Sequence, residues 1–386
     1  MNHHKNNKTI AIFVNTSWNI YNFRLELLRR LQREGYRVVT IAPRDRYSKN
    51  IEQAGFEHHH IDINNMGTNP LEDLLLTGKL FRLYRKIRPD LLLHYTIKPN
   101  LYGGYAAKLA GIPIISNISG LGTVFLNNDF SSRVARKLYR LALRVPQKVF
   151  FQNPHDRDHF VDTKLVARDR TALLPGSGIN HQRYSPVEKT HDGERPFVFL
   201  LIARMVKDKG IVEFVEAAQT LLRRSRAGLR GEQKNRVEFW LVGAMYPGNP
   251  TAICDEEIDA WTEEEGIRYL GETDDVTRVI ARSDCVVLPS YREGLSRVLL
   301  EAASMARPLI TTDVPGCKDV VDDGVNGFLC KAKDAQDLAV QMEKMLQLPW
   351  DEIQEMGRAG RRKIINEYSE HLVIDKYLDA IGEILN

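Results

Sequence analysis

Short apolar runs alternate with amphipathic stretches along almost the whole of this 386-residue chain. The first run, 9–14, precedes an amphipathic stretch at 22–33, and the second run lies at 37–42. The pattern predicts further strands and helices at 71–87, 90–94, 100–110, 112–117, 148–152 and 171–174. Strands that alternate with helices of this length form parallel sheets through right-handed crossovers. The chain is therefore expected to have an α/β fold.

A polar stretch divides the alternation into two series. Residues 186–196 contain two prolines and a glycine and show no periodicity, which is typical of a linker. A second series of apolar runs follows at 197–202, 237–243, 284–288 and 307–311. We predict two Rossmann-like domains, 1–185 and 197–367, with a C-terminal helix at about 368–386 that packs back on the first. In open parallel sheets ligands bind beyond the carboxyl ends of the strands, so we expect the site in a cleft between the domains.

The composition is that of a soluble globular protein, with 43% apolar and 27% charged residues. No run of about 18 apolar residues occurs, so no transmembrane helix is expected. The polar start, 1–8, predicts no secretory signal. The cysteines lack C-x-x-C spacing, which predicts reduced thiols in a cytoplasmic setting and no zinc site; they are Cys254, Cys285, Cys317 and Cys330.

Charge is divided unevenly along the chain. Residues 1–183 carry 28 Lys and Arg against 14 Asp and Glu, whereas residues 184–386 carry 26 against 36. A basic first half favours an anionic partner, either nucleic acid or an anionic membrane surface. We disfavour nucleic acid because no basic stripe interleaved with aromatic residues is present to stack bases.

Two glutamates, Glu293 and Glu301, flank the predicted start of a helix. The apolar run 285–288 ends at Pro289, and a loop containing Gly294 follows. Glu301 is then expected two turns into the helix, roughly 12 Å further along it. Two acids spaced in this way can hold two parts of one polyhydroxylated ligand, and the helix start offers free N–H groups to a diphosphate. For an isolated pair, solvated carboxylates are the commoner explanation, so the context decides.

Cations lie at a second strand end of the same half. Arg204 and Lys209 follow the run 197–202 and open a helix. Cations in that position can stabilise a departing nucleotide diphosphate. Leu270 and Gly271 end a further predicted strand.

This ordered set of segments resembles the family 4 glycosyltransferases, retaining enzymes of the GT-B fold, with two facing Rossmann-like domains and an interdomain cleft. The resemblance covers nearly the whole chain and is strongest from 202 to 329. It implies that Arg204 and Lys209 bind the donor diphosphate. It also implies that Glu301 holds the ribose hydroxyls and that Glu293 contacts the donor sugar. It further implies that the backbone of Gly294, Leu295 and Ser296 contacts the sugar and the phosphates. Leu270 and Gly271 are implied to lie beside the nucleotide base.

The first half narrows the resemblance. Segment 15–24 resembles the loop of bacterial transferases that add N-acetylgalactosamine to sugars linked to undecaprenyl diphosphate, and segments 94–100 and 117–122 support the same group. The resemblance implies Asn19 at the donor and four acceptor residues, Arg24, His94, Lys98 and Ser119. A packed strand-end histidine is the alternative for His94. Two departures leave the donor sugar and the acceptor geometry open: Ser119 stands where many members have histidine, and Leu295-Ser296 replaces a common Phe-Pro.

The predicted reaction is transfer, with retained configuration, of a sugar from a UDP-sugar to a lipid-diphosphate-linked saccharide in bacterial glycan or glycoprotein oligosaccharide assembly. An N-acetylhexosamine is expected, with N-acetylgalactosamine favoured. A phosphate oxygen of the leaving group is the expected base, and neither a cofactor nor a metal is expected. The alternatives are a UDP-sugar epimerase with the same fold and a catalytically silent nucleotide-sugar-binding partner. A nicotinamide-dependent oxidoreductase is disfavoured because Gly120-Leu121-Gly122 is only a fragment of the dinucleotide fingerprint.

Basic residues recur at helical spacing after residue 130, and they are Arg133, Arg136, Lys137, Arg140 and Arg144. This pattern predicts a peripheral protein on the cytoplasmic face of the inner membrane, with a solvated helix face as the alternative.

The run 58–60 contains three histidines, but neighbours in a strand point to opposite faces and cannot share a metal. Asp274-Asp275 and Asp322-Asp323 are expected to be a helix cap and a turn.

Overall fold

The structure, a computed structural model, describes residues 8–64, 69–120, 130–189, 195–227 and 237–385. The chain forms two compact units. The first comprises residues up to Gly178 together with the C-terminal segment from Glu370, and the second comprises Ile179–Ser369. The first unit thus ends shortly before the stretch 186–196 that the sequence predicts as the linker.

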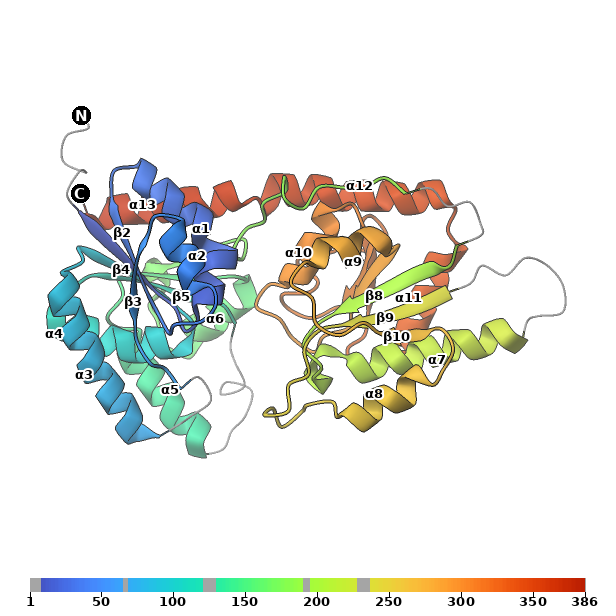
Figure 1. The fold of residues 1–386 in the computed structure, drawn as a ribbon, viewed down its shortest axis with the longest axis horizontal. Coiled ribbons are helices and arrows are strands. Elements are labelled where there is room, and N and C mark those ends of the chain that lie inside the picture. Colours follow the sequence, from blue (N-terminus) through green and yellow to red (C-terminus); the bar gives the residue numbers. More distant parts are fainter. Residues whose placement is uncertain (1–7, 65–68, 121–129, 190–194, 228–236, 386) are drawn as a thin grey trace. The chain divides into compact units, whose positions relative to one another are not determined.

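The first unit is built on a sheet of seven parallel strands in the order β3-β2-β1-β4-β5-β6-β7 (Figure 1). The strands are β1 (Thr9–Phe13), β2 (Arg37–Ala42), β3 (Glu57–His60), β4 (Leu91–Tyr95), β5 (Ile114–Ile118), β6 (Lys148–Phe151) and β7 (Thr171–Leu173). The register aligns His94 of β4 with Phe13 of β1 on one side and with Ser116 of β5 on the other. The central strands β1 and β4 are almost continuous apolar runs because helices cover both faces of a parallel sheet, whereas the edge strand β3 is polar.

The helices of the first unit pack on opposite faces of this sheet. They are α1 (Ser17–Arg33), α2 (Ser48–Gln53), α3 (Pro70–Ile87), a π-helical turn (Pro99–Gly103), α4 (Gly104–Ala110), α5 (Phe130–Ala142), α6 (Pro154–Asp162), a 3₁₀ turn (Arg168–Arg170) and α13 (Glu370–Leu385). Ile10 and Ile12 pack with α1 and α13, whereas Ala11 and Phe13 pack with α3 and α4. Alternate strand residues thus serve two cores, as the pleat requires.

Helix α1 begins earlier than the sequence predicts. The amphipathic pattern predicts a helix from residue 22 and a loop before it, but α1 starts at Ser17. The Thr16 side chain accepts a hydrogen bond from the Asn19 backbone N–H and caps the helix. Segment 15–24, which the resemblance describes as a loop, is therefore mostly helical.

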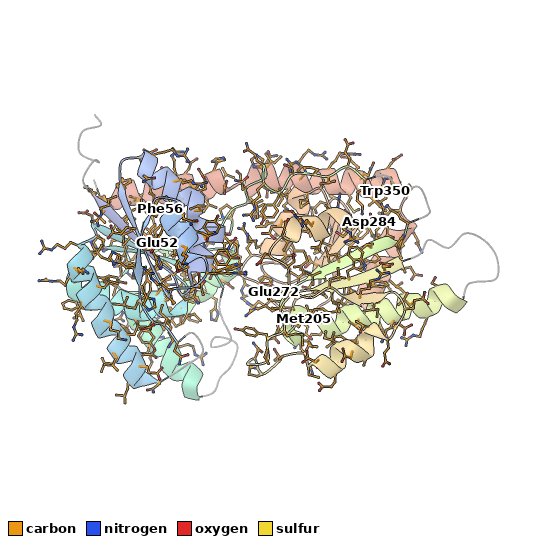
Figure 2. The ribbon with its side chains drawn as sticks, viewed as in Figure 1. Glu52, Phe56, Met205, Glu272, Asp284 and Trp350 are labelled. Carbon is orange, nitrogen blue, oxygen red and sulfur yellow. The ribbon has the colours of Figure 1, made fainter. Side chains whose placement is uncertain are left out.

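The second unit contains six parallel strands in the order β10-β9-β8-β11-β12-β13. The strands are β8 (Phe197–Ile202), β9 (Val237–Val242), β10 (Ile267–Tyr269), β11 (Cys285–Leu288), β12 (Leu309–Thr312) and β13 (Gly327–Cys330). Its helices are a 3₁₀ turn (Lys207–Lys209), α7 (Ile211–Ala227), α8 (Asp255–Thr262), α9 (Val276–Arg282), α10 (Arg297–Ser304), α11 (Ala335–Gln347) and α12 (Trp350–Glu367). Buried residues such as Phe56 in the first unit and Met205 in the second belong to the cores around these sheets (Figure 2).

Both sheets confirm the predicted α/β class with two Rossmann-like halves. In each, the strand order reverses beside the first strand, between β1 and β4 and between β8 and β11. Ligands of such sheets bind at the carboxyl edge at this reversal, where the two neighbouring connections leave in opposite directions. Within the described ranges, no helix combines the length and apolar character that crossing a membrane requires.

Candidate active site

An ion pair joins the ends of two neighbouring strands in the second unit. The Lys209 ammonium group contacts Oε1 of Glu293, and the side chains are 21% and 16% exposed. Lys209 ends the 3₁₀ turn after β8, and Glu293 lies in the loop after β11, the next strand of the sheet. The sequence expected both residues at strand ends, and the structure brings them into contact. An anion that approaches Lys209 must compete with this carboxylate.

The turn that carries Lys209 is held against the end of β11. Gly210 has φ of +73°, and a Cβ there would lie 2.1 Å from the carbonyl oxygen of Pro289. The backbone N–H of Tyr291 donates to the carbonyl of Asp208 at 2.9 Å. This close approach requires glycine at 210, because any side chain would push the turn away from the strand end.

The loop that carries Glu293 is fixed by the connection after β12. The Glu293 N–H donates to the Pro315 carbonyl at 3.2 Å, and the Ser296 N–H donates to the Gly316 carbonyl at 2.9 Å. Gly316 has φ of +80°, and a Cβ there would lie 2.3 Å from the Glu293 carbonyl oxygen. The backbone of residues 293–296 is therefore clamped from one side.

Glu301 lies in α10 and is only 6% exposed. Arg297 donates to its Oε1 at 2.8 Å, and Ser296 caps the helix. Burial, together with the charge of Glu301 and a hydrogen bond to it, raises the pKa of the Tyr184 hydroxyl to about 12. Two side chains thus orient the Glu301 carboxylate. Neither residue was predicted from the sequence, although Arg297 stands four residues before Glu301 at a spacing typical of helical ion pairs.

Arg204 follows β8 and lies over the ring of Tyr246. Its guanidinium carbon is 4.8 Å from the centroid of the Tyr246 ring, a cation–π contact, and the side chain is exposed. In the described part of the chain Arg204 forms no ion pair. Its charge is therefore available to a ligand.

Hydrogen bonds join the ends of β9 and β10 beside Leu270 and Gly271. The Gly243 N–H donates to the Gly271 carbonyl at 2.9 Å, and the Tyr269 hydroxyl donates to the Gly243 carbonyl at 2.7 Å. Leu270 is 42% exposed. These contacts fix the backbone at the carboxyl edge of the sheet, where Leu270 is an exposed apolar side chain.

In the first unit, Arg24 is a buried cation. Its side chain is 6% exposed, and the guanidinium carbon lies 4.4 Å from the centroid of the Tyr95 ring. One Nη donates to the Phe23 carbonyl at 3.1 Å, but Nε has no hydrogen-bond partner. Over the described ranges no carboxylate pairs with Arg24. Oδ1 of Asn19, one turn earlier in α1, is likewise a buried acceptor without a partner.

His94 is fully buried in the core of the first unit. One ring nitrogen lies 3.1 Å from the Tyr84 hydroxyl, and the Phe13 ring packs edge-on at 5.7 Å between centroids. Burial lowers the pKa of His94 to about 3, so the ring is neutral near pH 7. These contacts support the packed strand-end alternative for His94.

Lys98 already has a countercharge within the first unit. Its ammonium group lies 2.7 Å from Oδ1 of Asp73, and the two side chains are 13% and 8% exposed. The Tyr102 hydroxyl donates to the other oxygen of Asp73 at 2.6 Å. Asp73 neutralises the charge of Lys98, so Lys98 does not require an anionic ligand.

Ser119 is exposed just after β5, and the Leu121 and Gly122 that follow lie outside the described residues. Two asparagines before it are buried and bonded. Asn100 donates to the Asn117 carbonyl at 2.9 Å, and Asn117 donates to the Tyr377 hydroxyl of α13 at 3.0 Å. The C-terminal helix therefore supports this strand end, a contact between residues 260 positions apart that no local pattern indicates.

Among the described residues no group of three or more His, Cys, Asp or Glu side chains is placed to hold a metal ion. His58 contacts the Thr40 hydroxyl, His59 contacts Glu57 and His60 contacts Asp62. Asp275 accepts from the Thr277 N–H and caps α9, which confirms the predicted cap. In the predicted turn, Asp323 accepts from the Leu329 N–H.

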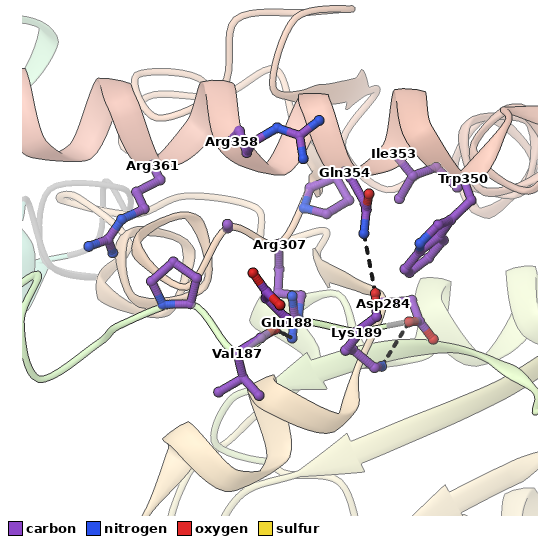
Figure 3. Close-up of a pocket in the computed structure, with 13 residues that line it drawn as sticks. Val187, Glu188, Lys189, Asp284, Arg307, Trp350, Ile353, Gln354, Arg358 and Arg361 are labelled. Carbon is purple, nitrogen blue, oxygen red and sulfur yellow. Dashed lines mark hydrogen bonds and ion pairs between the residues drawn. The ribbon is translucent and has the colours of Figure 1, made fainter. Parts of the chain in front are cut away.

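A separate pocket of about 270 Å³ lies at the amino end of β11 in the second unit (Figure 3). Asp284, immediately before β11, pairs with Lys189 at 2.8 Å, and Gln354 of α12 donates to the Lys189 carbonyl at 3.2 Å. Burial lowers the pKa of Lys189 to about 8 although Asp284 opposes the shift. The Lys189 ammonium group also donates to two backbone carbonyls. These contacts anchor the segment around Lys189 to the second unit.

Comparison with known proteins accounts for both halves of the chain. Residues 9–153 match the family described as "Glycosyl transferase 4-like", and residues 196–348 match "Glycosyl transferases group 1". The N,N'-diacetylbacillosaminyl-diphospho-undecaprenol alpha-1,3-N-acetylgalactosaminyltransferase of Campylobacter jejuni is 24% identical over 382 residues, which cover 95% of this chain and 96% of that protein. The UDP-Gal:alpha-D-GlcNAc-diphosphoundecaprenol alpha-1,3-galactosyltransferase of Escherichia coli is 22% identical over 80% of this chain and 79% of its own length.

Solved structures show the same fold. A glycosyltransferase from Rickettsia africae superposes with a TM-score of 0.78 at 19% identity, over 99% of each chain. Anabaena HepE in complex with UDP and glucose superposes with a TM-score of 0.77 at 17% identity, over 97% of this chain and 100% of that one. The chain therefore belongs to the family 4 and group 1 glycosyltransferases, enzymes of the GT-B fold.

Proposed function

We propose that this glycosyltransferase moves a sugar from a UDP-sugar to a saccharide linked to undecaprenyl diphosphate, with retained anomeric configuration. The transferred sugar is an N-acetylhexosamine, with N-acetylgalactosamine favoured, and the product enters a bacterial surface glycan or a glycoprotein oligosaccharide. The C. jejuni relative supports this proposal, because the similarity to it extends over nearly the whole of both chains.

The observation that carries the proposal is the Lys209–Glu293 pair at the ends of β8 and β11. A cation and a carboxylate in contact suit the two parts of a sugar diphosphate, since ammonium groups bind phosphate and carboxylates accept from vicinal hydroxyls. When the donor binds, Lys209 exchanges Glu293 for the diphosphate, and Glu293 turns to the sugar. Arg204, with an exposed guanidinium, adds a second charge for the leaving UDP.

The rest of the nucleotide lies along the same edge of the sheet. Glu301, oriented by Arg297, accepts from the ribose hydroxyls. Leu270 and Gly271 lie beside the base, where the exposed leucine offers an apolar surface. The backbone of Gly294, Leu295 and Ser296 meets the sugar and the phosphates.

The acceptor hydroxyl attacks the anomeric carbon on the face that the diphosphate leaves, and a phosphate oxygen of UDP takes the proton. Basic side chains and backbone N–H groups hold the diphosphate, so the reaction needs neither a metal nor a cofactor. In the first unit, Arg24 binds the acceptor diphosphate. Its burial without a carboxylate partner suits a cation that is completed by an anionic ligand. Ser119 is a further acceptor residue and Asn19 contacts the donor. The enzyme works on the cytoplasmic face of the membrane.

UDP release across a panel of UDP-sugars, with and without a polyprenyl-diphosphate-linked N-acetylhexosamine, tests the proposal. Acceptor-dependent release with one donor, and a lipid product one sugar larger, is the expected result. Conversion of a UDP-sugar without acceptor would favour the epimerase alternative. Tight UDP binding without any turnover would favour the silent partner, and either outcome would refute the proposed transfer.

A further inference from the structure

Helix α3 of the first unit presents three leucines to solvent on one face. Leu71, Leu74 and Leu75 are 71%, 69% and 66% exposed. Their spacing of three and four residues places them side by side on the helix surface. The other exposed leucines of this unit's described residues lie singly on three different helices, at Leu109, Leu141 and Leu372. Single exposed leucines are ordinary, whereas a contiguous exposed group marks an interaction surface.

The same face of α3 continues as a row of cations. After Gly78 come four exposed basic residues at helical spacing, Lys79, Arg82, Arg85 and Lys86. Within the described part of the chain, none of the four forms an ion pair or a side-chain hydrogen bond. We call the three leucines and these four cations the α3 stripe. It extends roughly 22 Å along the helix.

The fold does not need the stripe. The opposite face of α3 packs on the sheet through Leu76, Leu80 and Tyr84, which are buried in the core with Ala11 and Phe13 of β1. The acid nearest the leucines on the core side, Asp73, is occupied by Lys98 and Tyr102. The only exposed acid on α3 is Glu72, so the stripe is a cationic surface with an apolar end.

An anionic lipid bilayer fits this arrangement. Leucines enter the boundary between head groups and acyl chains, and Lys and Arg side chains extend to lipid phosphates. A second copy of the chain fits less well, because a two-fold interface would bring two rows of like charge together. A single-stranded nucleic acid would require aromatic side chains for stacking, and the stripe has none.

We infer that α3 docks the first unit on an anionic membrane by inserting Leu71, Leu74 and Leu75 while Lys79, Arg82, Arg85 and Lys86 bind the head groups. This surface differs from the basic helix predicted from the sequence, α5, where Arg140 donates to the Thr163 carbonyl within the protein. The inference rests on the proposed function only for the reason that the protein docks, because a lipid-linked acceptor lies in a bilayer.

Co-sedimentation of the full chain with phosphatidylcholine vesicles, with or without phosphatidylglycerol, tests the inference. One variant replaces each leucine of the stripe by serine, and a second replaces each of its four cations by glutamine. The cation variant is expected to bind phosphatidylglycerol vesicles roughly 600-fold more weakly at low salt, at roughly fivefold for each of the four basic residues near an anionic surface. The leucine variant is expected to bind these vesicles about 10³-fold more weakly, at roughly tenfold for each inserted leucine.

Matched controls separate the stripe from general changes in charge and apolarity. The leucine control carries Leu109→Ser, Leu141→Ser and Leu372→Ser, and the charge control carries Arg223→Gln, Arg278→Gln, Lys318→Gln and Lys331→Gln. Both controls are expected to bind vesicles within about twofold of the parent protein, because surface changes away from such features have small effects.

Several results would overturn the inference. They are equal binding to neutral and anionic vesicles, unchanged binding by both stripe variants, and an equal loss in the controls. A change of oligomeric state in the leucine variant with unchanged vesicle binding would show a protein interface instead. UDP release on a water-soluble short-chain acceptor is expected to be unchanged in the stripe variants. Since vesicle binding is measured without turnover, failure of the proposed transfer and failure of membrane docking remain distinguishable.

Discussion

Replacing Gly316 by alanine tests how closely the connection after β12 positions Glu293. The new Cβ would lie 2.3 Å from the Glu293 carbonyl oxygen and 2.5 Å from its carbonyl carbon. Carbon–oxygen contacts in proteins normally begin at about 3.3 Å, so the loop carrying Glu293 must move by about 1 Å. A displacement of that size can reduce turnover by about 10²-fold when the moved group orients the reacting sugar.

Gly324→Ala is the matched control. Gly316 and Gly324 have φ of +80° and +75°, but a Cβ at 324 meets no atom within 4 Å. The left-handed backbone therefore lowers the unfolding free energy of both variants by about 1–2 kcal/mol, and each kcal/mol lowers Tm by about 2–4 °C. Only Gly316→Ala displaces Glu293. We expect kcat/KM for acceptor-dependent UDP release to fall about 10²-fold in Gly316→Ala and less than about threefold in Gly324→Ala. Equal rates in the two variants would refute the assignment of Glu293 to the donor sugar.

Four further predictions address single residues. Arg204→Ala is expected to reduce kcat by about 10²-fold while the surface control Arg223→Ala does not, and an unchanged rate would exclude Arg204 from leaving-group stabilisation. Glu301→Ala is expected mainly to raise the donor KM, and a pure kcat defect would contradict ribose binding. Because the pKa of His94 is about 3 when folded and near 6.5 when unfolded, only the unfolded state gains a proton as pH falls through this window. Lowering the pH from 7 to 5 should therefore reduce the unfolding free energy of the parent protein by about 2 kcal/mol, measured by urea titration, whereas His94→Gln should not show this reduction. Equal reductions in the two proteins would contradict the burial of His94. Arg24→Met is expected to keep or raise Tm while acceptor KM rises, and a large fall in Tm would show that Arg24 serves the fold.

Local pattern predicted the strand ends correctly because parallel strands are buried on both faces and are marked by apolar runs. It therefore predicted Lys209 and Glu293 at the ends of separate strands. It failed at the start of α1, where the polar residues 15–19 suggest a loop and the Thr16 cap extends the helix instead. It did not reveal that β8 and β11 are neighbours, a consequence of strand order that depends on the whole sheet.

The sequence by itself determined the α/β class, the two series of strands, the residues at the carboxyl edges and the family. Only the tertiary structure decided which charges are already paired and which are available. Lys98 has Asp73 as a partner 25 residues away, whereas Arg24 is buried against Tyr95 with no carboxylate beside it in the described chain. It also decided that Leu71, Leu74 and Leu75 point away from the core. The physical reason is that strand and helix patterns are local, whereas pairing and exposure depend on side chains that folding brings together from distant positions.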